Sequence, residues 1–218
     1  MNSLLKRPNL NEIRKLDSHE ILDGKIIPYF SSLEKTLISY IIKSSYVIGC
    51  VAWLTNKNIL NALLECKGVK IIVNKEEYLD LDTDSGNTSY YMQVRKQYNS
   101  LQDLFKYKCD CCEGKMCKEL ECIIEEICPE LLINKKFKYG AIMSCGITNS
   151  LSRMHHKFLV FFNKDFIPQG VWTGSFNLTD NSNYSLENAI YINNKPVILE
   201  YCKEFFEIYK SSDHYSQI

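Results

Sequence analysis

The feature that most constrains the fold is an unbroken apolar run at residues 46–54, YVIGCVAWL. The run is about half the length of a membrane span and is rich in β-branched residues, so it predicts a strand buried on both faces of a sheet. A second run at 155–162, HHKFLVFF, carries apolar residues on both faces and predicts a central strand. Together with a hydrophobic content of 45%, these strands indicate a globular chain with a substantial core.

The segments around the first run alternate between helical and strand patterns. SSLE at 31–34 is a capping-box pattern, in which Ser31 caps the helix and Glu34 reaches back to it. Thr55 or Asn56 is expected to cap a second helix, and VKIIVN at 69–74 is expected to form the next strand. The order helix, strand, helix, strand predicts an α/β fold whose strands run parallel across the crossover.

The remaining sequence predicts one domain that contains an insertion. Residues 75–138 are polar and rich in tyrosine and cysteine, and we interpret them as the insertion. Regular structure returns after them, with strands expected at 139–145, 155–162, 170–177 and 187–192 and a helix opened by Pro196 at 196–210. We therefore expect a loosely packed arm at 1–25, a domain over 26–210 and a tail at 211–218.

Charge and the N-terminal sequence bear on partners and location. Lysine plus arginine equals aspartate plus glutamate, at 26 each, so the global charge favours neither nucleic acid nor a membrane as partner. The first residues lack the apolar core of a secretory signal. We therefore expect a soluble protein of the cytoplasm, in which most of the ten cysteines are reduced.

The motif with the most chemical content lies at the start of the second apolar run, in SRMHHKFLVFFN. On a strand, His155 and Lys157 point to the same side, and His156 points to the other. Downstream, TGSFN places Ser175 and Asn177 two residues apart. A cation, an imidazole, a hydroxyl and an amide that converge at strand ends predict an anion site.

Phosphoryl transfer is the chemistry that needs such a set of groups. Lys157 and Asn177 would hold phosphate oxygens, while the His155 imidazole attacks phosphorus or donates a proton. Gly174 would let the backbone approach the ligand closely, and Glu187 is a candidate acceptor for the second imidazole nitrogen. Taken alone, each residue also fits a structural role, because a histidine beside an apolar strand is more often structural.

The whole constellation resembles the phospholipase D superfamily. The signature of that family is His-x-Lys-x4-Asp, then Gly-Ser-x-Asn, then a Glu-Asn pair before a strand. Residues 26–74 and 139–210 are similar to it. The resemblance implies an α/β fold in which a mixed sheet is flanked by helices on both faces, with the Cys-rich segment as an insertion.

The same resemblance assigns roles to individual residues. His155 matches the nucleophile that forms a covalent phosphohistidine, and Glu187 matches the carboxylate that orients it. Lys157 and Asn177 match the phosphate binders, and Ser175 matches the small polar residue beside them.

One position departs from the family signature. The aspartate should fall at position 162, where this chain has Phe162. On a strand, position 162 faces away from His155 and Lys157, so an aspartate there would support the site without touching phosphate. We expect reduced rather than abolished activity, and an inactive member of the family is the alternative.

The chain carries one copy of the motif, whereas phosphohistidine chemistry needs a nucleophile on one side of phosphorus and an acid on the other. Members of the superfamily carry two copies or dimerise. The remaining histidines outside the motif, His19 and His214, lie near the termini without a matching lysine. We therefore expect a two-fold homodimer in which two copies of His155 face one phosphate, with no cofactor needed for catalysis.

Three functions remain open at this point. The single-motif layout is similar to small dimeric nucleases of the family and favours a metal-independent phosphodiesterase that cuts DNA or RNA. It is also similar to mitochondrial cardiolipin hydrolases, so a phospholipase D-type enzyme acting on a membrane lipid is the first alternative. Phe162 motivates the second alternative, an inactive binding module of the same fold.

A cysteine cluster lies within the expected insertion. Six of the ten cysteines fall between residues 109 and 128. Clustered thiolates favour a structural zinc site, with Cys109, Cys111, Cys112 and Cys117 as candidate ligands. The alternative is a helix at about 116–128 that carries idle thiols, because the spacing is irregular and no histidine lies nearby. The other four cysteines, at positions 50, 66, 145 and 202, sit in apolar settings and are expected in the core.

Overall fold

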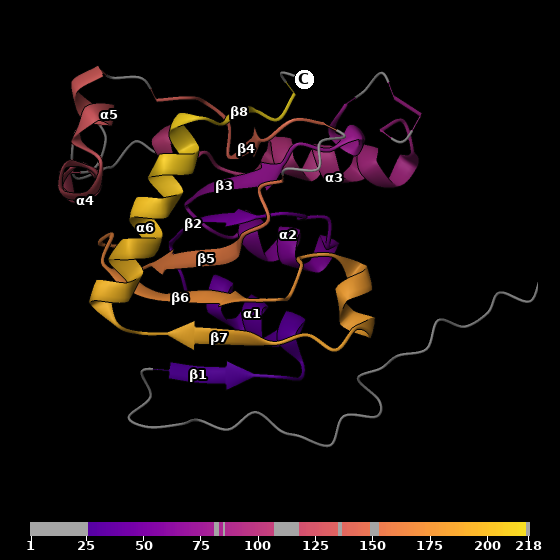
Figure 1. Cartoon of the computed structure of the whole chain (residues 1–218), viewed down its shortest axis with the longest axis horizontal. Coiled ribbons are helices and arrows are strands. Elements are labelled where there is room, and N and C mark those ends of the chain that lie inside the picture. Colours follow the sequence, from indigo (N-terminus) through magenta and orange to yellow (C-terminus); the bar gives the residue numbers. More distant parts are fainter. Residues whose placement is uncertain are drawn as a thin grey trace, which may run out of the picture.

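The computed structural model describes residues 26–80, 83–84, 86–106, 118–134, 137–148 and 153–216. Within these ranges the chain forms an eight-stranded mixed sheet with the order β1-β7-β6-β5-β2-β3-β4-β8 (Figure 1). The strands are β1 (Ile26–Tyr29), β2 (Tyr46–Val51), β3 (Gly68–Asn74), β4 (Ile142–Cys145), β5 (Lys157–Phe162), β6 (Pro168–Gly174), β7 (Ala189–Ile192) and β8 (Asp213–His214).

The first half of the sequence folds into the expected parallel unit. α1 (Leu33–Ile42) leads into β2, and α2 (Lys57–Leu64) connects β2 to β3. β2 and β3 are parallel, with Tyr46 opposite Gly68 at one end of the pair. Asn56 caps α2, because its Oδ1 accepts a hydrogen bond of 2.9 Å from the Ile59 amide. The parallel crossover is confirmed, and of the two capping residues that the sequence left open, Thr55 and Asn56, the structure has Asn56.

β5 is a central strand, as its apolar sequence predicts. It lies between β2 and β6 and runs antiparallel to both. Its residues from Phe158 to Phe162 are buried, and Lys157 at its start is half-buried. Alternate residues of β5 therefore pack into two different cores, one on each face of the sheet.

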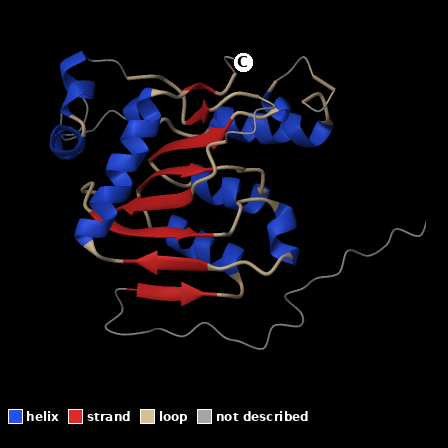
Figure 2. Ribbon diagram, in the orientation of Figure 1, coloured by secondary structure: helices blue, strands red, loops and turns tan. Residues whose placement is uncertain are grey.

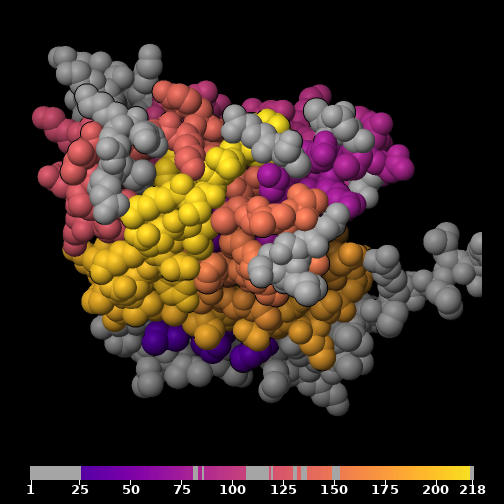
Figure 3. All heavy atoms as spheres, turned by 45° about the horizontal axis from the view of Figure 1, so that its top comes forward, coloured from indigo at the N-terminus to yellow at the C-terminus, as the bar shows by residue number. Residues whose placement is uncertain are grey.

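Helices cover both faces of the sheet (Figures 1 and 2). α1, α2 and α3 (Ser89–Ser100) pack on one face, where their apolar side chains join a core cluster that includes Leu37, Leu63 and Tyr98. α6 (Lys195–Lys210), α4 (Lys118–Ile127) and α5 (Pro129–Asn134) lie on the other. Figure 3 shows α6, in yellow, lying across that face. The mixed sheet flanked by helices on both faces is confirmed.

The capping box expected at 31–34 is wrong. Ser32 is the N-cap of α1, with a left-handed φ of 52° and no side-chain capping bond. The Glu34 carboxylate instead accepts hydrogen bonds from three amide side chains, Asn56 at 2.9 Å, Asn58 at 2.7 Å, and Asn183. These amide donors come from two segments that are distant from Glu34 in the sequence. A pattern of four consecutive residues therefore cannot predict these hydrogen bonds.

The sequence does not predict either edge strand, β1 or β8. β1 pairs with β7, and β8 pairs with β4, each antiparallel. Tyr215, just after β8, is buried, and its hydroxyl donates to Asn99 Oδ1 at 2.6 Å. Residues 211–216 are therefore part of the packed domain and not a separate tail. Strands of two and four residues are too short to show a periodic pattern.

The four cysteines of the expected zinc site, Cys109, Cys111, Cys112 and Cys117, lie outside the described residues, so the zinc site stays a prediction. No group of three or more histidine, cysteine, aspartate or glutamate side chains is arranged to hold a metal ion in the part of the chain that is described. The core prediction holds for three of the remaining cysteines, since Cys50, Cys66 and Cys202 are buried, whereas Cys145 is half-buried.

The helices among the described residues are all too short or too polar to cross a membrane.

Candidate active site

The candidate site lies at one edge of the sheet. Where neighbouring strands are antiparallel, the end of one strand lies beside the start of the next. β2, β3 and β6 end at this edge, and β5 and β7 begin there, as Figure 1 shows. Segments that are far apart in the sequence are thereby brought together. The five polar residues expected at the site flank these strand ends: His155, Lys157, Ser175, Asn177 and Glu187.

His155 and Lys157 are in direct contact. The Lys157 Nζ lies 3.2 Å from Nδ1 of His155, 3.3 Å from its Nε2 and 3.0 Å from its carbonyl oxygen. The His155 side chain is open to solvent. Partial burial, then the positive charges of Lys157 and Arg153, lower the pKa of His155 below its ordinary value. A lowered pKa keeps the imidazole neutral, which is the form that can act as a nucleophile.

His156 points to the opposite side of the sheet, as strand alternation predicts. Its Nε2 lies 3.0 Å from the Glu204 carboxylate on α6. The two histidines therefore have different environments although they are adjacent in the sequence. His156 makes a partly exposed surface contact and does not fill the core.

Ser175 joins the loop after β6 to the start of β7. Its hydroxyl donates to the Glu187 carboxylate and accepts a hydrogen bond of 3.1 Å from the Asn188 amide. The Glu187 charge acts on Lys157, whose pKa is lowered by burial and raised by this carboxylate. Glu187 thus belongs to the same charge cluster as Lys157. Its expected role in orienting His155 stays a prediction.

Gly174 is explained by the packing of two strands. A Cβ at this position would lie 2.3 Å from the carbonyl oxygen of Asn188, so a side chain would push β6 away from β7. The residue also has a φ of 154°, which L-amino acids rarely adopt. The close approach of Gly174 is therefore to a neighbouring strand, and its expected contact with a ligand stays a prediction.

Asn177 has an unsatisfied polar atom in a cleft. Its Oδ1 is buried and has no hydrogen-bond partner among the described residues. It lines a cleft of about 680 Å³ together with Glu187 and Trp53. A buried polar atom without a partner is uncommon and costs free energy, so a ligand N–H or O–H group that donated to this oxygen would stabilise the site.

A family model described as "Cardiolipin synthase, PLD-like domain" matches residues 37–209. The chain belongs to the phospholipase D superfamily. The chain is similar to "Uncharacterized protein L381" of Acanthamoeba polyphaga mimivirus, at 48% identity over 211 residues, or 95% of this chain and 74% of that protein.

Solved structures share the fold of this phospholipase D superfamily chain. Nuc of Salmonella typhimurium, described as a phospholipase D family member, has a TM-score of 0.53 at 15% identity, over 88% of this chain and 98% of Nuc. NucT of Helicobacter pylori has a TM-score of 0.52 at 14% identity, over 87% of this chain and 98% of NucT. At these identities the likeness concerns the fold alone.

The position that departs from the phospholipase D signature is remote from the site. Phe162 ends β5, five residues after Lys157, which corresponds to roughly 16 Å along a strand. It is buried in the core cluster on the α6 face, whereas Leu159 and Phe161, which share the orientation of Lys157, belong to the other cluster. The expectation that position 162 faces away from the site is confirmed.

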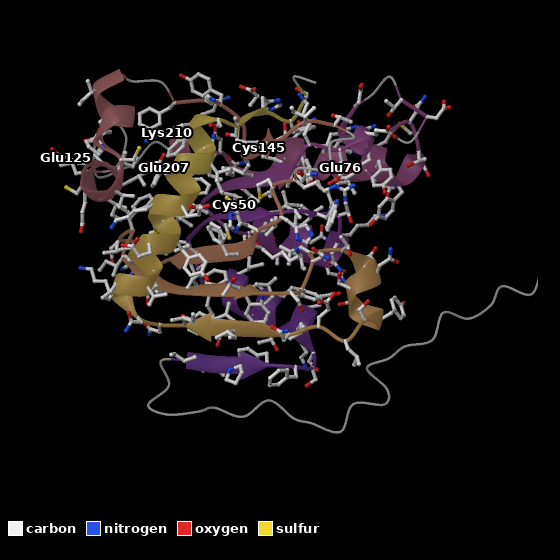
Figure 4. All side chains as sticks on the ribbon, in the orientation of Figure 1. Cys50, Glu76, Glu125, Cys145, Glu207 and Lys210 are labelled. Carbon is white, nitrogen blue, oxygen red and sulfur yellow. The ribbon has the colours of Figure 1, made fainter. Side chains whose placement is uncertain are left out.

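The site also contains Trp53 and Glu76, two residues that the sequence did not indicate. The Trp53 ring packs edge-on against the His155 ring, with centroids 5.3 Å apart, and the Lys157 Nζ lies 5.7 Å from the Trp53 ring centroid. Trp53 Nε1 donates to the Glu76 carboxylate at 3.1 Å. Figure 4 labels Glu76 at the site edge of the sheet. Glu76 therefore orients the indole that contacts both motif residues.

The same carboxylate connects to the segment that enters β5. Asn74 Nδ2 donates to Glu76 at 2.7 Å, and Asn74 Oδ1 accepts a hydrogen bond of 3.0 Å from the Met154 amide. The end of β3 thus fixes the backbone immediately before His155. One signal in the sequence could have indicated this arrangement, because ligand sites in α/β sheets gather beyond the carboxyl ends of parallel strands. Trp53 and Glu76 each follow such a strand.

Proposed function

We propose that this protein is a metal-independent phosphodiesterase that cleaves nucleic acid through a covalent phosphohistidine at His155. The observation that carries the proposal is the contact at 3.2 Å between the Lys157 ammonium and the solvent-exposed His155 imidazole. Asn177 adds an amide to the same edge of the sheet. Membership of the phospholipase D superfamily supports phosphodiester chemistry, and the names of Nuc and NucT favour a nucleic acid as substrate.

The reaction balances in two steps. In the first, a nitrogen of His155 attacks phosphorus and forms a P–N bond, while the P–O bond to the leaving oxygen breaks and that oxygen receives a proton from a second imidazole. In the second step, water attacks phosphorus, the P–N bond breaks, and the second imidazole takes up the proton of the water. Lys157 and Asn177 offset the negative charge on the non-bridging oxygens throughout.

The second imidazole is proposed to come from a second copy of the chain. His156 points to the other side of the sheet, and His214 lies on β8, four strands from β5 and so roughly 19 Å away. His155 is exposed and available to the partner subunit's His155 across a two-fold axis. Sedimentation should give about twice the chain mass of 25.4 kDa, and a monomer at micromolar concentration would contradict a shared site.

The function is tested by incubating the protein in EDTA with single-stranded DNA, duplex DNA, RNA and cardiolipin vesicles. We expect cleavage of nucleic acid that is lost in His155→Ala and retained in His156→Ala, the matched control whose side chain contacts Glu204. A labelled phosphoryl group should also stay attached to the denatured wild-type protein and not to His155→Ala. Cleavage of cardiolipin alone would replace the proposal with a phospholipase, and binding without turnover would replace it with an inactive binding module.

A further inference from the structure

The cleft that contains Asn177 has an aromatic wall, which we define as Trp53, Tyr78, Tyr90 and Tyr91. Tyr78 and Tyr91 are stacked with ring centroids 4.7 Å apart and an interplanar angle of 18°. Tyr90 packs edge-on against Tyr91 at 5.2 Å. Tyr78 is buried, whereas Tyr90, Tyr91 and Trp53 are half-buried and keep part of their rings open to the cleft.

The aromatic wall is held rigidly against the edge of the sheet. The Tyr90 hydroxyl donates to the Thr55 carbonyl at 2.9 Å and to the Asp180 carboxylate at 3.2 Å. The buried guanidinium of Arg95 donates to the carbonyl oxygens of Tyr78 and Gly86, both at 2.6 Å. These bonds join α3 to three other segments. A wall fixed in this way loses little conformational entropy when a planar ligand stacks on it.

The cleft is lined by negative charge. Trp53 marks one end, where the ring contacts His155 and Lys157 and donates to the Glu76 carboxylate. The described lining residues include no lysine or arginine, but they do include the carboxylates of Glu76, Asp180 and Glu187. A second phosphate would be repelled there. A neutral planar group with amino hydrogens would be attracted, since it can stack on tyrosine and donate to carboxylate oxygens.

We propose that this cleft is a base-binding subsite, which receives the nucleobase next to the phosphate held by His155 and Lys157. The inference rests on the proposed nuclease function and adds the substrate class, a nucleic acid with unpaired bases at the site. A base inside a duplex is stacked between its neighbours and cannot enter a cleft walled by tyrosine. A volume of about 680 Å³ is within the usual range for a small-ligand pocket.

The test compares two single-stranded oligonucleotides that have the same phosphates, one with all its bases and one made of abasic nucleotides. Binding is measured by fluorescence anisotropy on His155→Ala, which does not cut the probe, and cleavage is measured on the wild-type protein. We expect the oligonucleotide with bases to bind roughly ten-fold more tightly, which is within the range of aromatic–base stacking. It should also bind and be cut better than the same sequence in a duplex.

Variants of the aromatic wall test whether the preference for bases comes from this wall. Tyr91→Ala, in the His155→Ala background, should remove most of the preference for bases, and Tyr91→Phe should keep it because the ring remains. Tyr139→Ala is the matched control, since Tyr139 is 63% exposed and is not among the cleft residues. The comparison of the two oligonucleotides needs no wall variant, so it decides the proposal even if Tyr91→Ala does not fold.

The outcomes separate the two proposals. Equal binding of the two oligonucleotides would overturn the base subsite even if the wild-type protein cuts both. A preference for bases that depends on the Tyr91 ring would support the subsite even if the wild-type protein cuts neither, and that result would overturn the nuclease function alone. A preference that survives in Tyr91→Ala would overturn the assignment of the subsite to this wall.

Discussion

The Lys157 ammonium lies 3.2 Å from Nδ1 of His155 and 3.0 Å from the carbonyl oxygen of the same residue. The lysine is thus held by the backbone of the residue whose side chain it influences. The partial burial of the imidazole and then the positive charge of Lys157 lower the pKa of His155. The neutral imidazole therefore persists to lower pH than that of an ordinary histidine.

The first prediction concerns the titration of His155. Because the pKa of His155 is lowered, we expect its NMR titration midpoint to lie below that of an ordinary histidine. Replacing the nearest cation, in Lys157→Met, should raise the midpoint, and Arg153→Gln should raise it less, since the charge of Arg153 has a smaller effect than that of Lys157. The chain has four histidines, so the imidazole signals can be assigned one by one with single replacements. A midpoint unchanged in Lys157→Met would contradict the electrostatic cause.

The second prediction concerns Glu76, which acts on the site through Trp53. Glu76→Ala removes the acceptor for the Trp53 indole at 3.1 Å and for the Asn74 amide at 2.7 Å. We expect kcat to fall by on the order of ten-fold, because a loosened indole no longer fixes His155 and Lys157.

The NMR signal of His155 provides a readout that separates positioning from general damage. The His155 ring lies at the edge of the indole, so its chemical shift should move in Glu76→Ala when the indole reorients. Glu65→Ala, at an exposed carboxylate after α2, is the control and should leave both kcat and the shift unchanged. A normal kcat in Glu76→Ala would contradict the proposal that Glu76 positions the site through Trp53.

The third prediction concerns Phe162, where the superfamily signature has aspartate. Phe162 is 4% exposed in an apolar core, so Phe162→Asp should lower the free energy of unfolding by about 3–5 kcal/mol. We expect no gain in activity, since the residue is remote from Lys157. Phe162→Leu should cost about 1 kcal/mol and leave activity intact. Thermal unfolding and the cleavage assay measure the two effects, and a stable, more active Phe162→Asp protein would refute this account.

The fourth prediction concerns a buried charge outside the site. Lys70 is fully buried, and its Nζ donates to Asp103 at 3.0 Å, to the Lys138 carbonyl at 2.6 Å and to the Gly140 carbonyl at 2.7 Å. Lys70→Met leaves the carboxylate and two carbonyls without their cation. We expect a loss of about 3–5 kcal/mol in the free energy of unfolding. Lys67→Met, at an exposed lysine nearby, should be nearly neutral.

The same lysine gives the stability a pH dependence whose sign is fixed. Burial lowers the pKa of Lys70 to about 8, so the unfolded chain binds more protons than the folded one between that value and the ordinary lysine pKa of about 10.4. The contribution of Lys70 to stability is therefore greatest above that window and declines as pH falls toward 8. Denaturant unfolding of wild type and Lys70→Met across this range measures the difference, and parallel profiles would contradict it.

The local pattern of the sequence was sufficient for the central part of the fold. Apolar runs of β-branched residues placed β2, β3 and β5, and the pair Thr55 and Asn56 marked the start of α2, because burial on both faces and helix capping depend on a few consecutive residues. The boundaries of β5 and β6 moved by only two or three residues. The short edge strands were missed because the signal that forms them is the unpaired edge of a neighbouring strand.

For the candidate site, the sequence indicated the chemical groups, because His155 and Lys157 stand two residues apart, as do Ser175 and Asn177, and such spacing is a local property of the chain. The residues that surround these chemical groups depend on the tertiary structure. Trp53 follows β2 and Glu76 follows β3, two strands that end at one edge of the sheet, and Tyr91 on α3 lines the same cleft. Contacts of this kind depend on the order and direction of the strands, which result from packing across the whole domain. No periodic pattern in a single segment of the sequence indicates them.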